Sequence, residues 1–208
     1  MTFPYLDISQ KSVDSFADVV YNFSRIENIC NSPTKRTAEA CTVALRFLQQ
    51  SENLDFSSIS FCEAVAYGAE ACCYASAFGF REVYSIEYSD AGRKLAYKRL
   101  TRVGPGAQRL VRLQLGRYQE NFVIDAGITY FDTNLYDDLD EGVVLEAFLR
   151  LCKLLLPGSY IVIVTQIGIT EFRLGDWGVD YMELVLPTTV SKVENDESSL
   201  LVYKIIAI

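Results

Sequence analysis

The chain of 208 residues contains no histidine. Without an imidazole, the sequence excludes Ser-His-Asp and Cys-His nucleophile systems, histidine-containing zinc sites and any histidine pH switch. No apolar run approaches the roughly 20 residues that a membrane-spanning helix needs, and no secretory signal is recognisable at the amino terminus. We therefore expect a cytoplasmic protein that binds no metal and does not enter a membrane.

The sequence also has no C-x-x-C pair among its six cysteines. Two of them, Cys72 and Cys73, are adjacent, which is a poor geometry for one zinc ion or for a simple disulfide. Most of the others lie in apolar runs. We expect them to be small buried side chains in a reducing compartment.

The composition, 50% hydrophobic and 22% charged, is that of a globular protein. Residues 1–57 are predicted to form a helical extension. Apolar residues at helical spacing indicate one helix around Val13–Phe23, and Ser32-Pro33 is a good start for a second, which ends near Ser51. Residues 58–208 are predicted to form one compact domain.

In that domain short apolar strands alternate with helices, which predicts an α/β fold with a doubly wound, mostly parallel, seven-stranded sheet. The last two strands have no helix between them, so we expect a carboxy-terminal antiparallel hairpin at the sheet edge. The predicted strands are Ile59–Cys62, Val83–Ile86, Leu110–Leu115, Ile128–Phe131, Tyr160–Val164, Met182–Leu186 and Leu200–Ile206, and the predicted helices are Ala69–Ala77, Asp90–Arg102 (capped by Ser89) and Asp140–Leu155.

Two strand ends carry the residues of a candidate binding site. Ligands of open parallel sheets bind beyond the carboxyl ends of the strands, where the strand order reverses. The first strand runs into Glu63-Ala64-Val65-Ala66-Tyr67-Gly68, where small residues let a ligand approach the backbone. Glu87 ends the second strand 19 residues after Gly68, where an acid can accept both hydrogen bonds of a ribose diol.

Residues Phe61–Leu100 resemble the cofactor half of class I S-adenosylmethionine-dependent methyltransferases. Glu63–Gly68 corresponds to their acidic, glycine-rich first motif, and the run Val83–Ser89 is similar to their second motif. Leu149–Ile163 is similar to their helix, Pro-Gly turn and fifth strand. The resemblance covers about residues 58–207. A fainter likeness, to non-SET histone-lysine methyltransferases, is carried by the helical extension, Ile86-Glu87 and Asn134.

This resemblance implies S-adenosylmethionine as the cofactor. The cofactor-binding residues that it implies are Glu63, Ala64, Val65, Tyr67, Gly68, Glu87, Tyr88, Gly116 and Arg117. The sequence departs from the family at two places. Val65 and Tyr67 stand where the first motif usually has glycines, and Arg117 stands where the family usually has an acid near the adenine.

The segment after the fourth strand faces the methyl acceptor in this family. Asp132 would orient or deprotonate a nitrogen nucleophile, Asn134 would hold a substrate amide and Tyr136 would enclose the site. The same segment is also acidic enough to be a solvated loop. Methyl transfer needs in-line positioning more than strong acid–base chemistry, so the missing histidine does not exclude it.

The charge is unevenly distributed. Between Arg93 and Arg117 there are eight basic residues and no acid, whereas the rest of the chain has 11 basic and 27 acidic residues. A basic segment fits nucleic acid, an acidic partner or a second copy of this acidic chain in a homodimer. The net charge of −8 favours the protein partners over nucleic acid.

Two functions follow from the sequence. The first is a methyltransferase that acts on a protein or a small-molecule acceptor. The alternative is a catalytically inactive protein of the same fold that serves as a binding or scaffold subunit, as the reduced first motif and Arg117 indicate.

Overall fold

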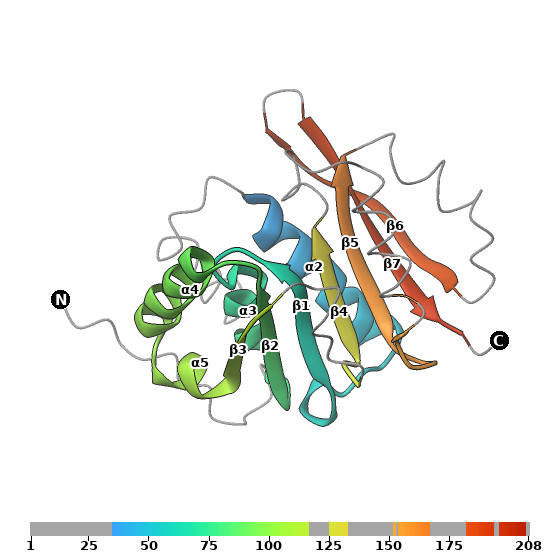
Figure 1. Ribbon diagram of the computed structural model, residues 1–208. Coiled ribbons are helices and arrows are strands. Elements are labelled where there is room, and N and C mark those ends of the chain that lie inside the picture. Colours follow the sequence, from blue (N-terminus) through green and yellow to red (C-terminus); the bar gives the residue numbers. More distant parts are fainter. Residues whose placement is uncertain are drawn as a thin grey trace.

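The computed structural model describes residues 35–116, 125–132, 152, 154–166, 182–193 and 196–206. They form a seven-stranded sheet with the order β3-β2-β1-β4-β5-β7-β6 (Figure 1). The strands are β1 (Ser60–Ala66), β2 (Glu82–Glu87), β3 (Val111–Leu115), β4 (Ile128–Asp132), β5 (Tyr160–Gln166), β6 (Met182–Val193) and β7 (Asp196–Ile205).

Strands β1 to β5 pair in parallel, and β7 runs antiparallel to both of its neighbours, β5 and β6. The strand order reverses between β1 and β4, which places the switch point of the sheet at the carboxyl end of β1. The predicted fold class and the terminal hairpin are confirmed.

The two hairpin strands are longer than the sequence predicted. The residues between the two predicted strands, 187–199, lie largely within β6 and β7. Backbone pairing continues through Thr189↔Ser199 and Val190↔Ser198. The hydrogen bonds between strands join main-chain groups and do not depend on apolar side chains. A prediction from hydrophobicity alone therefore makes these strands too short.

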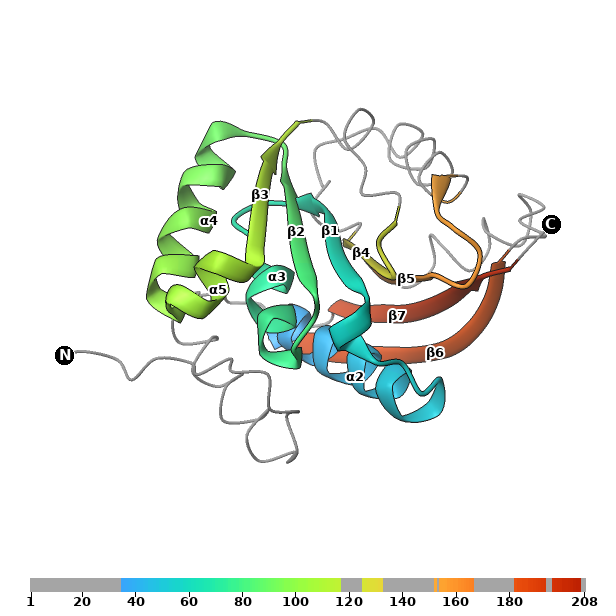
Figure 2. The ribbon, with the colours of Figure 1, turned by 90° about the horizontal axis from the view of Figure 1, so that it is seen from below.

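Among the described residues, four α-helices pack against the sheet, α2 (Lys35–Ser51), α3 (Glu70–Ala75), α4 (Asp90–Val103) and α5 (Pro105–Leu110), together with the short 3-10 helices Phe56–Ser58 and Ser76–Phe78. Helices α2 to α5 lie on one side of the sheet (Figure 2). The predicted cap of α4 is confirmed, because Ser89 Oγ accepts a hydrogen bond from the Gly92 amide at 3.0 Å. Helix α5 was not predicted; it begins at Pro105, whose missing N–H costs nothing in the first turn of a helix.

One large core fills the space between these helices and the sheet. On α2 the buried residues are Ala40, Cys41, Ala44, Leu45 and Leu48, and they belong to the same cluster as strand residues such as Phe61 and Val162. Helix α2 therefore shares a core with the sheet, while the predicted division of the chain at residue 57 stays a prediction. The expected helix at Val13–Phe23 and the Ser32 cap lie outside the described residues.

A second cluster lies on the opposite face of the sheet. It joins Ala64 and Val65 of β1 to Phe131, Ile161 and Ile163, and Cys152 and Leu155 pack on it. Most of the predicted helix Asp140–Leu155 lies outside the described residues. Within the described part of the chain, five cysteines are buried and no disulfide joins them, and no helix there is long and apolar enough to cross a membrane.

Candidate functional site

The connection from β1 to α3 forms the centre of the candidate site. Strand β1 continues through Ala66, beyond the predicted end at Cys62, and its register with β2 shifts between Glu63 and Ala66. This shift is a β-bulge, in which one extra residue of β1 faces the partner strand. Ala64 and Val65, expected in a ligand-facing turn, are instead strand residues, and both side chains are buried in the second core cluster.

Gly68 follows directly on this strand, in a conformation that favours glycine. Its φ is +92°, and the next residue, Ala69, also has a positive φ of +52°. A Cβ on Gly68 would overlap the Arg99 guanidinium and lie 2.9 Å from the Leu95 side chain. The turn therefore needs glycine both for its backbone angle and for its close approach to α4.

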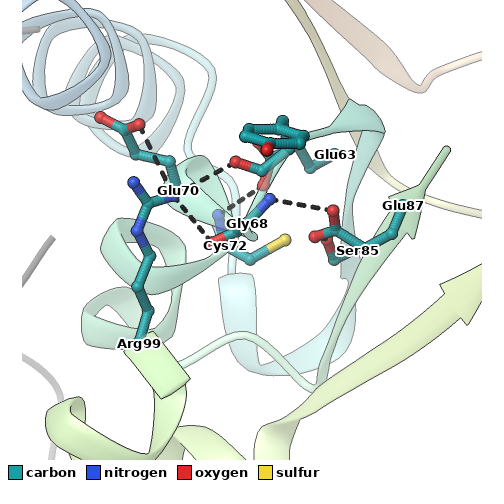
Figure 3. Close-up of polar contacts among 8 residues, drawn as sticks. Glu63, Gly68, Glu70, Cys72, Ser85, Glu87 and Arg99 are labelled. Carbon is teal, nitrogen blue, oxygen red and sulfur yellow. Dashed lines mark hydrogen bonds and ion pairs between the residues drawn. The ribbon is translucent and has the colours of Figure 1, made fainter. Parts of the chain in front are cut away.

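The carboxylate of Glu87 holds this turn from the end of β2 (Figure 3). Glu87 Oε2 accepts a hydrogen bond from the Gly68 amide at 2.9 Å, and Oε1 accepts one from Ser85 Oγ at 2.9 Å. The nearby Ala69 amide also lowers the pKa of this carboxyl group. Glu87 is completely buried. Burial raises the pKa of Glu87, and these hydrogen bonds and the nearby Arg99 oppose that shift.

Glycine at position 92 makes room for this carboxylate. A Cβ on Gly92, in the first turn of α4, would lie 2.6 Å from Glu87 Oε2 and 3.2 Å from the Tyr67 ring. Real Cβ atoms do not approach an oxygen that closely, so a side chain here would displace the Glu87 carboxylate. Gly92 is therefore part of the site although its own amide is bound by Ser89.

A second buried acid lies beside Glu87. Glu63 is 3% exposed, and its Oε2 accepts a hydrogen bond from the Cys72 amide at 3.1 Å. Burial and the neighbouring Glu87 raise the pKa of Glu63 to about 8. At neutral pH Glu63 therefore retains its proton.

Arg99 of α4 ties the turn to the helix. Its Nη1 donates to the carbonyl oxygens of Tyr67, at 3.2 Å, and Gly68, at 3.0 Å, and lies 3.9 Å from Glu70 Oε2 (Figure 3). The turn is thus held from both sides, since its amides bind the Glu87 carboxylate and its carbonyls bind the Arg99 guanidinium.

Two tyrosines mark the solvent side of the site. The rings of Tyr67 and Tyr88 are stacked, with centroids 5.7 Å apart and planes 28° apart, and the residues are 42% and 51% exposed. The backbone of Gly116, after β3, lies alongside, because its amide donates to the Glu87 carbonyl at 3.0 Å. An exposed aromatic pair next to a buried carboxylate and a glycine turn suits a ligand with a planar ring and polar substituents.

The structure brings together most of the cofactor-binding residues expected from the sequence, namely Glu63, Tyr67, Gly68, Glu87, Tyr88 and Gly116, and separates Ala64 and Val65 from them. Of the expected acceptor residues, Asp132 is 2% exposed at the end of β4. Asn134, Tyr136 and Arg117 lie outside the described residues.

Three contributors to the site were not expected from the sequence. Ser85 precedes Glu87 by two residues on the same strand. Because side chains alternate between the two faces of a strand, this spacing could have predicted that Ser85 lies on the same face as Glu87. Gly92 lies within α4, and the sequence shows it only as a residue of low helix propensity, with no sign of a contact to the site. Arg99 was counted only among the eight basic residues between Arg93 and Arg117, and no local pattern links it to a turn 31 residues earlier.

Comparison with known proteins places the fold. No family model matches the sequence, and no curated protein sequence matches it. Many solved structures match the fold. The glycopeptide N-methyltransferase MtfA is similar over 80% of this chain and 90% of its own, with a TM-score of 0.61 and 12% identity.

Two further similar structures are methyltransferases of RNA. The Bacillus subtilis M1A22 tRNA methyltransferase TrmK has a TM-score of 0.57 and 13% identity, over 76% of this chain and 64% of its own. An RNA methyltransferase from Salinibacter ruber has a TM-score of 0.55 and 18% identity, over 85% of this chain and 95% of its own.

The chain therefore has the α/β fold of class I S-adenosylmethionine-dependent methyltransferases. The fold expected from the sequence resemblance is confirmed.

Proposed function

We propose that this chain binds S-adenosylmethionine at the β1–α3 turn and transfers its methyl group to an acceptor. One observation carries the proposal: the Glu87 carboxylate at the end of β2 is bonded to the Gly68 turn at the end of β1, on the edge of the sheet where ligands of such folds bind. Similar structures of MtfA contain S-adenosylmethionine, sinefungin or S-adenosylhomocysteine.

The donors and acceptors at this turn fit a nucleoside. A carboxylate offers about four acceptor positions, and the Gly68 amide and the Ser85 hydroxyl occupy two of them. A ribose diol brings two hydroxyl donors, which match the two remaining acceptor positions. The glycine turn allows close backbone approach, and the exposed Tyr67–Tyr88 pair offers aromatic faces to an adenine.

The cofactor supplies an electrophilic methyl group on a sulfonium, and the protein positions the acceptor in line with it. We assign the acceptor side to the end of β4, with Asp132 as the described residue and Asn134 and Tyr136 as further candidates. The similar structures act on a glycopeptide and on RNA. For this chain we retain the acceptor classes expected from its sequence, a protein or a small molecule.

Calorimetric titration with S-adenosylmethionine and S-adenosylhomocysteine tests the proposal. The wild type is expected to bind both. Removing a charged hydrogen-bonding group typically costs about 1.5–3 kcal/mol, so Glu87→Ala should bind at least tenfold more weakly. Glu82→Ala, at the other end of the same strand, is the matched control and should bind as the wild type does.

Glu87→Gln shows how much of the loss in ligand binding comes from the charge and how much from the shape of the side chain, because the amide has nearly the size of the carboxylate. A wild type that gives no heat with either ligand, or binding that is indifferent to Glu87, contradicts the proposal. Either result favours the alternative function, a methyltransferase fold that serves as a binding or scaffold subunit.

A further inference from the structure

The Glu87 carboxylate is closed to solvent in this structure. The residue is completely buried, and the Gly68 amide and the Ser85 hydroxyl bind its two oxygens (Figure 3). The proposed function requires a ribose diol to contact these oxygens. A group that covers the carboxylate must therefore move before a ligand reaches it.

The Tyr67 ring lies beside this carboxylate. The position that a Cβ on Gly92 would occupy is 2.6 Å from Glu87 Oε2 and 3.2 Å from Tyr67 Cδ2, so the oxygen and the edge of the ring are near neighbours. The backbone at Tyr67 is fixed, because its carbonyl oxygen accepts a hydrogen bond from Arg99 Nη1 at 3.2 Å. The residue is 42% exposed, and exposed side chains change rotamer within nanoseconds. The ring is therefore the part of the cover that can move while the turn stays in place.

A second tyrosine packs on this ring. Tyr88 follows Glu87 directly, and Tyr67 directly precedes Gly68, so the two tyrosines flank the hydrogen bond that joins the β1–α3 turn to the end of β2. Their rings are stacked, with centroids 5.7 Å apart and planes 28° apart. A base in contact with both rings, at about 3.5 Å from each, needs a separation of about 7 Å. A small outward rotation of the Tyr67 ring makes that space.

The two rings stand on a fixed backbone. Each tyrosine directly follows a member of the register pair Ala66↔Glu87, the last pair between β1 and β2. Neighbouring strands lie about 4.8 Å apart, so the two side chains start close together. The tyrosines are nevertheless 42% and 51% exposed. Exposed aromatic surface at a fixed spacing favours a planar ligand that covers both rings.

We infer that Tyr67 and Tyr88 form an aromatic clamp for a nucleoside. The Tyr67 ring turns away from Tyr88, the ribose reaches Glu87, and the two rings then contact the base on its opposite faces. The inference rests on the proposed function for the class of ligand, and it adds the step that opens the site and the residues that select an aromatic base. Tyr67 stands where the family that the sequence resembles usually has glycine, so this half of the clamp is a feature of this chain.

Calorimetric titration of the full chain with adenosine and with S-adenosylhomocysteine tests the clamp. Stacking of a base on an aromatic ring typically contributes about tenfold in affinity, so Tyr67→Ala and Tyr88→Ala should each weaken the binding of both ligands by about that factor. Tyr67→Phe should bind as the wild type does, because it keeps the ring. Tyr97→Ala is the matched control: Tyr97 is 64% exposed on the side of α4 away from Gly92, and its removal should change neither affinity.

Nuclear magnetic resonance separates a ring contact from a structural role of the tyrosines. In protein with isotope-labelled tyrosine rings, the signals of Tyr67, Tyr88 and Tyr97 are assigned by their loss in the corresponding phenylalanine variants. Adenosine between the rings should shift the Tyr67 and Tyr88 signals through the ring current of the base, whereas the Tyr97 signal should stay in place. Thermal unfolding confirms that each variant is folded.

The outcomes distinguish the clamp from the proposed function. Binding of S-adenosylhomocysteine that is equal in the wild type, Tyr67→Ala and Tyr88→Ala overturns the clamp and leaves the proposed function intact. Adenosine binding that depends on both rings, without binding of S-adenosylmethionine or S-adenosylhomocysteine, supports the clamp and contradicts the proposed function. A loss of affinity without shifts of the two ring signals indicates a structural role and overturns the clamp. An equal loss in Tyr97→Ala, or no binding of either ligand by the wild type, also overturns it.

Discussion

The Glu87 carboxylate and the Gly68 amide, 19 residues apart in sequence, are joined by a 2.9 Å hydrogen bond across the ends of two parallel strands. This bond joins the end of β2 to the turn after β1, so the two segments form one structural unit.

Gly92→Ala should weaken nucleoside binding while leaving the helix intact. The new Cβ would come within 2.6 Å of Glu87 Oε2, so the carboxylate must leave its position at Gly68. Alanine favours a helix over glycine by about 0.5–1 kcal/mol, which offsets part of the strain. Titration with S-adenosylhomocysteine and thermal unfolding are to be compared with Ala91→Gly, on the exposed side of the same turn. Unchanged affinity in Gly92→Ala would contradict the role of Gly92.

Glu63→Gln should remove a pH dependence of stability. The folded-state pKa of Glu63 is about 8, above its ordinary value, so the folded protein holds a proton that the unfolded chain releases. Stability is therefore lost as pH rises from about 4.5 to 8, by at most about 1.4 kcal/mol for each pKa unit. Glutamine keeps an oxygen for the Cys72 amide and has no proton to lose.

The difference in unfolding free energy between Glu63→Gln and the wild type should accordingly grow in favour of the variant from pH 5 to pH 8. Urea unfolding at both pH values measures it. Parallel pH profiles for the two proteins would show that Glu63 is not protonated in the folded state.

Arg99→Met should loosen the Tyr67–Gly68 turn. Methionine keeps most of the aliphatic stem and removes the donors to two carbonyls and the ion pair to Glu70. Hydrogen bonds from a charged donor contribute about 1.5–3 kcal/mol, so stability should fall by about 2 kcal/mol and the Gly68 amide should exchange its hydrogen faster. Arg112→Met, an exposed arginine on β3, is the control. Equal exchange rates at Gly68 in both variants would rule out the contact as a restraint.

Glu52→Gln should release the end of α2 from the sheet. Glu52 Oε2 accepts hydrogen bonds from Tyr160 Oη at 2.6 Å and Lys204 Nζ at 3.1 Å, and these bonds lower its pKa. A lowered pKa means stability that is present at neutral pH and lost as pH falls through the folded-state pKa. The variant should be about 1 kcal/mol less stable at pH 7, and the difference should narrow towards pH 3. A constant difference across this range would contradict the charge-dependent part of the contact.

The sequence predicts the sheet architecture better than it predicts the local pairing and side-chain contacts within that architecture. The alternation of strands with helices, and the absence of a helix between the last two strands, are enough to predict a parallel sheet with an antiparallel end, because parallel neighbours need a crossover connection and antiparallel neighbours do not. The bulge in β1 is different: small apolar residues such as Ala64 and Val65 suit a strand as well as a ligand turn, and only pairing with β2 decides between them.

Within the site, the contacts that could be predicted are those that follow from the spacing of residues in the sequence. Glu87 and Gly68 were expected together because a strand–helix–strand unit brings its two strand ends to one edge. Arg99 acts through a contact between α4 and a turn 31 residues earlier, and Gly92 acts by leaving room for the Glu87 carboxylate; both contacts depend on how the helix is rotated on the sheet. No local pattern in the sequence encodes that rotation.

The position of β7 between β5 and β6 also sets an order of assembly. During synthesis the ribosome releases β6 before β7, yet β6 pairs only with β7 among the described strands. Until residues 196–205 emerge, β6 has no partner within the sheet, and β5 presents an open edge to other nascent chains. Strand β7, which is made after both of its neighbours, is therefore needed to join β6 to the sheet, and a translation pause between β6 and β7 would prolong the exposure of the β5 edge.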